Sequence, residues 1–307
     1  MKKVLVIVVT HNGMRWLERC LSSVAGDGRP EPAMTDVYVL DNDSTDGSAD
    51  YIQAHFPQVH LVRSAENLGF TGGNNLGIQY ALERGYDYVY LLNQDAWLEE
   101  GALEKLVAAA EAHPEYAVLS PLQMTDGFTA FDTQFAKLYR PGAKTAQNAP
   151  GSDKNDVPGA KTAQIAPGTV EVKRVMAAHW LVPVDAIRKI GLFSELFPYY
   201  GQDDDWCNRA RYHGYRIAVV PQARAVHDRA RRQESRERII DRNYRVGSLI
   251  RLCDINRPLW ERFLFVCLFT LVKAVKYRSL QPFKHFRSLC KQLPQIRAHR
   301  SKARLPL

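Results

Sequence analysis

The sequence of 307 residues predicts an α/β fold, with a mainly parallel central sheet flanked by helices and a helical C-terminal extension. Over the first hundred residues, short apolar runs alternate with amphipathic segments of about ten residues, which is typical of βαβ units. Polar clusters follow three of the apolar runs, and basic residues concentrate in the last third of the chain. A chain of this length can form one large domain with an appendage.

The first hundred residues alternate between predicted strands and predicted helices. The predicted strands are Lys3–Val9, Val37–Leu40, Val59–Val62 and Tyr88–Leu92. The predicted helices are Met14–Val24, Ser44–His55, Asn74–Arg84 and Gly101–Ala112. Apolar spacing, cap-type residues and a closing glycine support these helices. Because ligands gather at the carboxyl ends of parallel strands, we expect a site in the loops that follow them.

The middle of the chain carries a short duplication. Residues 141–150 read PGAKTAQNAP and residues 158–167 read PGAKTAQIAP, so nine of ten positions match. Two such short, polar units cannot bury a core, which predicts a flexible insertion at about 140–168 within a first domain of residues 1–233. The later predicted elements are a short helix Asp185–Ile190, a helix Trp206–His213, a strand Ile217–Val220, an edge strand Ala225–His227 and a helical region from about Glu234 to Leu293.

Positive charge is concentrated in a predicted second domain, residues 234–307. Residues 224–307 hold 21 Lys and Arg against 6 Asp and Glu, and no acid follows Lys273. The apolar run Phe263–Val272 is too short to cross a bilayer, which takes about 20 residues, but it suits a helix lying at a membrane surface. We therefore expect residues 256–307 to bind an anionic membrane. A solvated basic helix packed on the first domain is the alternative.

The cysteine pattern bears on the compartment. The five cysteines are Cys20, Cys207, Cys253, Cys267 and Cys290. They form no CxxC pair and no even-numbered framework, which fits a reducing compartment and argues against a structural zinc site. Together with the basic extension, this predicts a cytoplasmic protein that lies peripherally on the inner face of the plasma membrane.

The polar clusters at the ends of the predicted strands are candidates for one shared site. They are His11-Asn12, Asp41-Asn42-Asp43 and Asn93-Gln94-Asp95. Asp and Asn side chains in 41–48 can hydrogen-bond a nucleobase, although the same residue types favour turns and N-caps. The glycine-rich stretch 67–77 lacks the spacing of a P-loop and of GxGxxG. It would allow close approach of the backbone to an anion, or form only a tight turn.

Asp95, an acidic cluster and a histidine carry candidate chemistry. Asp95, with Asn93 nearby, is a plausible oxygen ligand for Mg²⁺ or Mn²⁺, although it could also cap the following helix. The acidic cluster consists of Asp203, Asp204 and Asp205, which are consecutive. Carboxylates this close raise one another's pKa, so one of them could serve as a general base, or else the cluster caps the helix after it. His227 follows a strand and is either a structural residue or a metal ligand.

Five stretches together resemble the family 2 glycosyltransferases of the GT-A fold, especially bacterial rhamnosyltransferase-like members. They are VVTHNG (8–13), DNDSTDGS (41–48), NLGFTGGNNLGI (67–78), LLNQDAWL (91–98) and GLFSELFPYYGQDDDWCNRARYHGY (191–215). They occur in the order and at roughly the spacing of the family, and they cover most of residues 1–230. The resemblance implies inverting transfer of a sugar from a nucleoside diphosphate sugar to an acceptor hydroxyl, with Mg²⁺ or Mn²⁺ as cofactor.

The resemblance also implies roles for individual residues. The implied nucleotide-binding residues are Thr10, His11, Asn12, Asp41, Asn42, Asn67, Gly69, Phe70, Asn74 and Asn93. Asp41 would bind the base, Asp95 and His227 would hold the metal, and Asp203 would be the catalytic base. Asn93 stands where the family usually has the first aspartate of its metal motif. Gln202-Asp203 replaces the common Glu-Asp pair, and Asp204 is an unusual neighbour, so both Asp203 and Asp204 stay candidates for the base.

The resemblance also leads us to expect certain substrates. A dTDP-rhamnose or UDP-sugar donor and a glycan or lipid-linked acceptor in cell-surface polysaccharide synthesis are implied by the resemblance. A processive synthase would need transmembrane helices and a Gln-x-x-Arg-Trp motif, which the sequence lacks, so one sugar is expected per transfer. The alternative function, from a different functional class, is that of a non-catalytic nucleic-acid-binding protein that uses the basic extension. The carboxylates of the first 230 residues argue against it, and we expect no nucleic acid partner.

Overall fold

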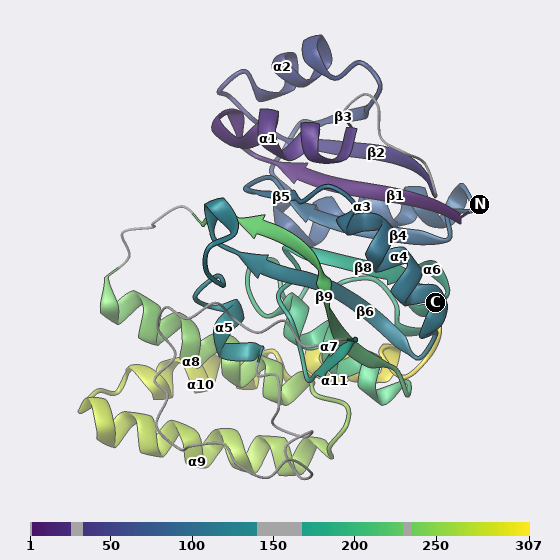
Figure 1. Ribbon diagram of the computed structural model, residues 1–307. Coiled ribbons are helices and arrows are strands. Elements are labelled where there is room, and N and C mark those ends of the chain that lie inside the picture. The colour runs from purple at the N-terminus through teal and green to yellow at the C-terminus, as the bar shows by residue number, and fades with distance from the viewer. Residues whose placement is uncertain (1, 26–32, 140–167, 230–234) are drawn as a thin grey trace, which may run out of the picture.

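The computed structural model describes residues 2–25, 33–139, 168–229 and 235–307, so the predicted insertion lies almost wholly outside the described residues. Its centre is one sheet in the order β3-β2-β1-β4-β8-β6-β9-β5, with β7 paired to β9 (Figure 1). The strands are β1 Lys2–Thr10, β2 Ala33–Asn42, β3 His60–Ser64, β4 Tyr88–Asn93, β5 Ala96–Leu98, β6 Tyr116–Met124, β7 Val170–Val172, β8 His179–Pro183 and β9 Arg216–His227. The helices are α1 Met14–Ala25, α2 Ser48–His55, α3 Gly69–Glu83, α4 Ala102–Ala112, α5 Phe135–Leu138, α6 Val184–Ile190, α7 Gln202–Tyr212, α8 Arg236–Cys253, α9 Leu259–Tyr277, α10 Gln281–Lys291 and α11 Leu293–Lys302.

The predicted parallel core of the sheet is confirmed. β3, β2, β1 and β4 pair in parallel, so their carboxyl ends lie along one edge. At that edge Thr10 is in register with Asp41, and Val9 with Asn93. β8 runs antiparallel to both β4 and β6, whereas β9 is parallel to β6, so the second half of the sheet is mixed.

β6 is a strand that the sequence analysis missed. All its residues are buried, yet Pro121 interrupts its apolar pattern. The pairing between β6 and β9 shifts register just after Pro121. Proline cannot donate to a strand ladder and is tolerated at such a bulge, so this residue marks an irregular central strand.

The two strands predicted at Ile217–Val220 and Ala225–His227 are parts of one strand, β9. The register shift opposite Pro121 falls between them, which is why the sequence divides them. The prediction of an edge strand was wrong, because Ala225–His227 has β6 on one side and β5 on the other.

The helices α2, α3 and α7 begin at other residues than predicted. α2 begins later, at Ser48, because Asp46 accepts hydrogen bonds from the backbone N–H of Ser48 at 3.0 Å and of Met14 at 3.1 Å. α3 begins earlier, at Gly69, so most of the glycine-rich stretch is helical. α7 likewise begins at Gln202, which places the acidic cluster in its first turn.

The glycines of α3 allow the helix to lie close to the sheet. A Cβ atom at Gly77 would lie 2.6 Å from Cγ2 of Ile7, and one at Gly73 would lie 2.8 Å from Cγ1 of Val9. Both distances are far below van der Waals contact. Gly73 and Gly77 therefore serve helix–sheet packing.

Helices cover both faces of the sheet. One buried cluster packs α1, α2 and α4 against one face of the strands, with Leu17, Ile52 and Leu106 among its members. The other packs α3, α5, α6 and α7 against the opposite face, with Ile78, Phe135 and Trp206. The strand-end loops are thus held on a rigid three-layer body (Figure 1).

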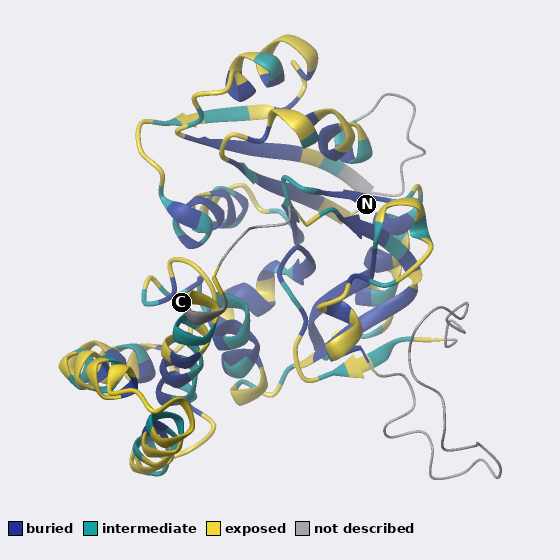
Figure 2. Ribbon diagram, turned by 90° about the vertical axis from the view of Figure 1, so that its left-hand side faces the viewer, coloured by how far each residue is buried: buried dark blue, intermediate teal, exposed yellow. Residues whose placement is uncertain are grey.

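The C-terminal region is helical as predicted, and it continues beyond Leu293 through α11. α8 to α11 share a small core of Leu252, Val266, Leu289 and Ile296, which also buries Phe197 from the loop before α7. The outer sides of these helices are exposed (Figure 2). Within the described ranges, no helix has the length and apolar character needed to cross a membrane.

Candidate active site

The loops after β1, β2 and β4 are tied together by hydrogen bonds. Gln94 Oε1 accepts from Thr10 Oγ1 and from the backbone N–H of His11, both at 2.8 Å. His11 Nδ1 lies 2.9 Å from the backbone oxygen of Asn42. Asn12, at a left-handed φ of 49°, accepts from the backbone N–H of Thr45 at 2.8 Å. The three predicted clusters therefore form one layer at the strand ends.

Asp41 is a buried carboxylate with an unused oxygen. Its side chain is 4% exposed. Oδ2 accepts from the backbone N–H of Ser44 at 3.2 Å, whereas Oδ1 is buried and has no hydrogen-bond partner among the described residues. Because an unsatisfied buried oxygen costs free energy, this position favours a ligand that donates an N–H group.

The amide groups of three other predicted residues are used within the protein. Asn42 donates to Asn67 Oδ1 at 2.9 Å and accepts from the backbone N–H of Leu68 at 2.8 Å. Asn67 Oδ1 also accepts from Tyr199 Oη at 3.1 Å. Asn74 Nδ2 donates to the backbone oxygen of Phe70 at 2.8 Å. These amides hold the loop before α3 in place and link it to the loop before α7.

A cavity of about 1000 Å³ opens beside this layer. The sequence-predicted residues that line it are Phe70, Asn93, Asp95, Asp203, Asp204 and His227. The other sequence-predicted residues do not line the cavity, and they are Thr10, His11, Asn12, Asp41, Asn42, Asn67, Gly69 and Asn74. The structure thus brings both candidate bases and both candidate metal ligands to one cavity, while the implied base-binding residues lie outside it.

Asp95 and His227 face each other at one side of the cavity. Oδ1 of Asp95 lies 3.5 Å from Nε2 of His227. Burial on its own would raise the pKa of Asp95, but the hydrogen bond and charge of His227, helped by Arg229, hold this pKa below its ordinary value. Asp95 is therefore ionised at neutral pH.

The pair fits a divalent cation. Neighbouring ligand atoms of an octahedral ion, each about 2.1 Å from the metal, lie about 3 Å apart, close to the separation of Asp95 and His227. His227 Nδ1 is buried and has no partner among the described residues, so this imidazole is not fully used by the fold. Within the described part of the chain, no cluster of three or more His, Cys, Asp or Glu is arranged to hold a metal. Mg²⁺ and Mn²⁺ need few protein ligands when a diphosphate and water complete the shell.

Asp203 and Asp204 differ in their surroundings. Asp204 forms an ion pair with Arg174. Asp203 has no such partner among the described residues and accepts only from the backbone N–H of Asp204, at 3.0 Å. Burial, and next the charge of Asp204, raise the pKa of Asp203 to about 6. Asp203 is thus the carboxylate suited to accept a proton near neutral pH.

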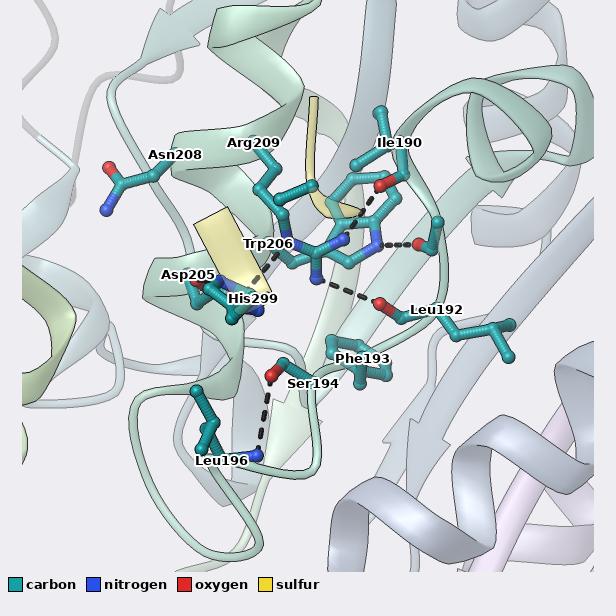
Figure 3. A network of polar contacts seen from close by, with 12 residues as sticks. Ile190, Leu192, Phe193, Ser194, Leu196, Asp205, Trp206, Asn208, Arg209 and His299 are labelled. Atoms are coloured by element: carbon teal, nitrogen blue, oxygen red, sulfur yellow. Dashed lines mark hydrogen bonds and ion pairs between the residues drawn. The ribbon is translucent and has the colours of Figure 1, made fainter. Parts of the chain in front are cut away.

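The third carboxylate of the cluster is structural. Asp205, 1% exposed, pairs with Arg209 at 2.9 Å and with Nε2 of His299 at 2.9 Å. Burial opposes ionisation of Asp205, but Arg209 and then His299 hold its pKa below the ordinary value. Arg209 also donates to the backbone oxygens of Ile190 and Leu192 (Figure 3). This network fixes the first turn of α7, and with it Asp203, to the neighbouring loop and to α11.

The sequence analysis missed the cationic residues of the cavity. Arg174, Arg229, Arg242, Arg251 and Arg262 all line it. Three of them come from the C-terminal helices α8 and α9, which reach the site only through tertiary packing. The one available signal was the excess of arginine after residue 224, which the sequence analysis assigned to an external surface.

The chain is similar in sequence to known proteins. Residues 5–163 match the family described as glycosyl transferase family 2. The chain is 27% identical over 237 residues to an N-acetylglucosaminyl-diphospho-decaprenol L-rhamnosyltransferase of Mycobacterium tuberculosis, covering 73% of this chain and 76% of that protein. It is 23% identical over 234 residues to a low-salt glycan biosynthesis hexosyltransferase of Haloferax volcanii, covering 73% and 66%.

Solved structures share the fold. TarS of S. aureus superposes with a TM-score of 0.56 at 17% identity, over 86% of this chain and 42% of that one. GalNAc-T7, solved with UDP, GalNAc and Mn²⁺, gives a TM-score of 0.55 at 15% identity, over 75% and 44%. The chain therefore spans less than half the length of both structures. The predicted GT-A fold is confirmed, and the enzyme prediction is supported over the non-catalytic alternative. The chain belongs to glycosyl transferase family 2.

Proposed function

We propose that the protein is an inverting glycosyltransferase that moves one sugar from a nucleoside diphosphate sugar to a hydroxyl of a glycan or lipid-linked acceptor. The observation that carries this proposal is the sharing of one cavity by the Asp95–His227 pair and by Asp203, whose pKa is raised to about 6. The L-rhamnosyltransferase relative favours rhamnose as the transferred sugar. The proposed donor is dTDP-rhamnose or a UDP-sugar, and the proposed role is in cell-surface polysaccharide synthesis.

The reaction is a single displacement. Asp203 takes the proton of the acceptor hydroxyl while the hydroxyl oxygen attacks the anomeric carbon of the donor sugar. The bond from that carbon to the nucleoside diphosphate breaks at the same time. Asp95 and His227 would hold a Mg²⁺ or Mn²⁺ ion, which neutralises charge on the departing diphosphate. Arg174 pairs with Asp204, beside Asp203. One displacement gives inversion at the anomeric carbon.

Base recognition is assigned to the layer beside the cavity. In this proposal Asp41 Oδ1, which is buried and without a partner among the described residues, would accept from the ring N–H of a uracil or thymine. Thr10, His11 and Asn12 lie next to Asp41 at the strand ends, and Asn42, Asn67, Gly69 and Asn74 hold the neighbouring loop before α3. A pyrimidine diphosphate is therefore the expected donor nucleotide.

Replacing Asp95 by alanine should abolish the gain in nucleotide affinity that Mn²⁺ provides. Calorimetric titration of UDP, dTDP and GDP, each with and without Mn²⁺, measures this gain on the wild type and on the variant. We expect one pyrimidine diphosphate to bind at least about tenfold more tightly with the metal, and only in the wild type. Asp50→Ala, which removes an exposed carboxylate of α2, is the control. Absence of nucleotide binding in the wild type would contradict the proposed function.

We propose one side of α9 as the surface through which residues 256–307 bind a membrane. Trp260, Leu264, Leu268, Leu271 and Val275 share one side of α9 at helical spacing. Each is at least half exposed, and Val275 is 78% exposed. Exposed basic residues follow on α9 to α11, including Lys276 and Lys284. An apolar stripe with neighbouring cations suits the interface of an anionic bilayer, on the inner face of the plasma membrane.

Substituting Trp260, Leu264 and Leu268 together by serine should reduce binding to phosphatidylglycerol vesicles by at least about tenfold, because each buried leucine contributes about 1.5–3 kcal/mol. Vesicle flotation of the full chain measures the bound fraction. Leu76→Ser changes an exposed leucine on α3 and should leave binding unaltered. If the triple variant floats as well as the wild type, α9 is not the membrane surface.

A further inference from the structure

Arg251 of α8 lies in the cavity wall. Its guanidinium donates from Nη1 to the backbone oxygen of Gly247 at 2.7 Å, and it lies over the rings of Phe265 and Phe269 at 5.2 and 5.4 Å. Among the described residues, no ion pair joins it to Asp or Glu. A half-buried cation without a counter-ion is unfavourable unless a ligand supplies the negative charge.

A second arginine adds to this charge. Arg262 of α9 also lines the cavity and pairs with Asp254. Its Nε is buried and has no partner among the described residues. Of these two guanidinium groups, only that of Arg262 has a carboxylate partner among the described residues. Burial, and then repulsion from Arg262, lower the pKa of Arg251, while Asp204 acts in the opposite direction.

Arg251 lies next to the N-terminus of α7 in the cavity wall. A Cβ atom at Gly201, two residues before Asp203, would lie 3.2 Å from Cδ1 of Ile250, the neighbour of Arg251 on α8. The part of the cavity that α7 and α8 line is therefore where the catalytic base and the acceptor hydroxyl would meet. The leaving diphosphate of the donor belongs at Asp95 and His227.

An exposed apolar surface of α9 adjoins Arg251. Phe265 lies under the guanidinium of Arg251 and is itself 44% exposed. It precedes Leu268, Leu271 and Val272 on α9, which are all more than half exposed. A ligand with an anionic group at Arg251 and a hydrocarbon chain along α9 would satisfy both features.

We propose that Arg251 and Arg262 form a subsite for the phosphate of a lipid-phosphate-linked acceptor, whose hydrocarbon chain leaves along α9 and whose sugar points to Asp203. This inference rests on the proposed function and names its acceptor class. Guanidinium groups bind phosphate oxygens in a planar, two-pronged geometry, which makes arginine suited to this task. The subsite orders the acceptor so that one hydroxyl of its sugar reaches the base.

The test uses the full chain with UDP and Mn²⁺ at saturation, so that the donor site is filled. Calorimetry then measures binding of geranyl diphosphate, of geraniol and of inorganic pyrophosphate. Geranyl diphosphate should bind most tightly, since only it offers both the charge and the chain. Pyrophosphate binding as tightly as geranyl diphosphate, or no geranyl diphosphate binding at all, would overturn the proposal.

Arg251→Met should weaken geranyl diphosphate binding about tenfold to a hundredfold, while the methionine keeps apolar contact with the phenylalanines. Arg251→Lys should weaken it less, because the charge remains. Arg245→Met, at an exposed arginine of α8 outside the cavity, is the matched control and should bind normally. UDP affinity should stay within about twofold in each variant.

Two outcomes separate this inference from the proposed function. A loss of UDP affinity in Arg251→Met, with geranyl diphosphate binding intact, would assign the arginine to the donor and overturn the inference alone. A wild-type protein that binds no nucleotide would instead contradict the proposed function, whatever geranyl diphosphate does.

Discussion

Replacing Asp203 by asparagine should lower the rate of sugar transfer by about 10²–10⁴-fold, the usual contribution of a general base. Asparagine keeps the size of the side chain and can still accept from the backbone N–H of Asp204. It cannot take the proton of the acceptor hydroxyl. Nucleotide binding should persist, because Asp95 and His227 are untouched. Initial rates with a donor sugar and an acceptor, beside calorimetry with the nucleotide, separate these two effects.

The pH profile gives an independent check on Asp203. Since its pKa is raised to about 6 in the folded protein, the carboxylate is protonated below that pH, and transfer should rise as the pH increases through 6. The same shift means that the folded state loses stability as the pH rises from about 4 to 6. Asp203→Asn removes this loss, so the variant should melt at a higher temperature than the wild type at pH 8.

Asp204→Asn is the matched control for Asp203. It removes the neighbouring negative charge and the partner of Arg174, so the pKa of Asp203 should fall and the acid limb of the profile should move to lower pH. Transfer at pH 8 should change only modestly. If Asp204→Asn is the inactive variant and Asp203→Asn is active, the base is Asp204.

The strands that the sequence could predict are those with uninterrupted apolar runs. β1 and β4 each present such a run, and both were placed correctly. β6 and β9 carry prolines where the register between them shifts. The apolar pattern of the sequence is interrupted at these prolines, although the two strands pair on both sides of the shift. What preserves these strands is burial between neighbours on both sides, a property of the assembled sheet that no short window of sequence contains.

The residues of the candidate site also differ in how far the sequence predicts them. Asp95 follows strand β4 and Asp203 lies at the start of helix α7, so the local sequence pattern was enough to predict their positions. The cations of α8 and α9 are brought to the cavity by long-range packing around Phe197. The distinct roles of Asp203, Asp204 and Asp205 also depend on partners distant in sequence, namely Arg174 and His299.

Asp205→Ala should lower the free energy of unfolding by about 3–5 kcal/mol, which is typical when one partner of a buried ion pair is removed. Arg209, 3% exposed, would keep its bonds to two backbone oxygens but lose its only carboxylate among the described residues. Urea denaturation at pH 7 measures the change. Asp50→Ala breaks an exposed ion pair with Arg63 and should cost less than about 1 kcal/mol.

The same network makes the stability of the C-terminal helices depend on α7. His299 reaches Asp205 from α11, and His213, after α7, lies 2.9 Å from the backbone oxygen of Ala303. Asp205→Ala should therefore increase tryptic cleavage after Arg297 under native conditions, while His299→Ala should have a smaller effect on global stability because Arg209 still neutralises Asp205. Unchanged cleavage in a destabilised Asp205→Ala variant would mean that α11 is held by its apolar contacts alone. In that case the first turn of α7, which carries Asp203, would be linked to the C-terminal helices by the apolar core around Phe197 and not by Asp205.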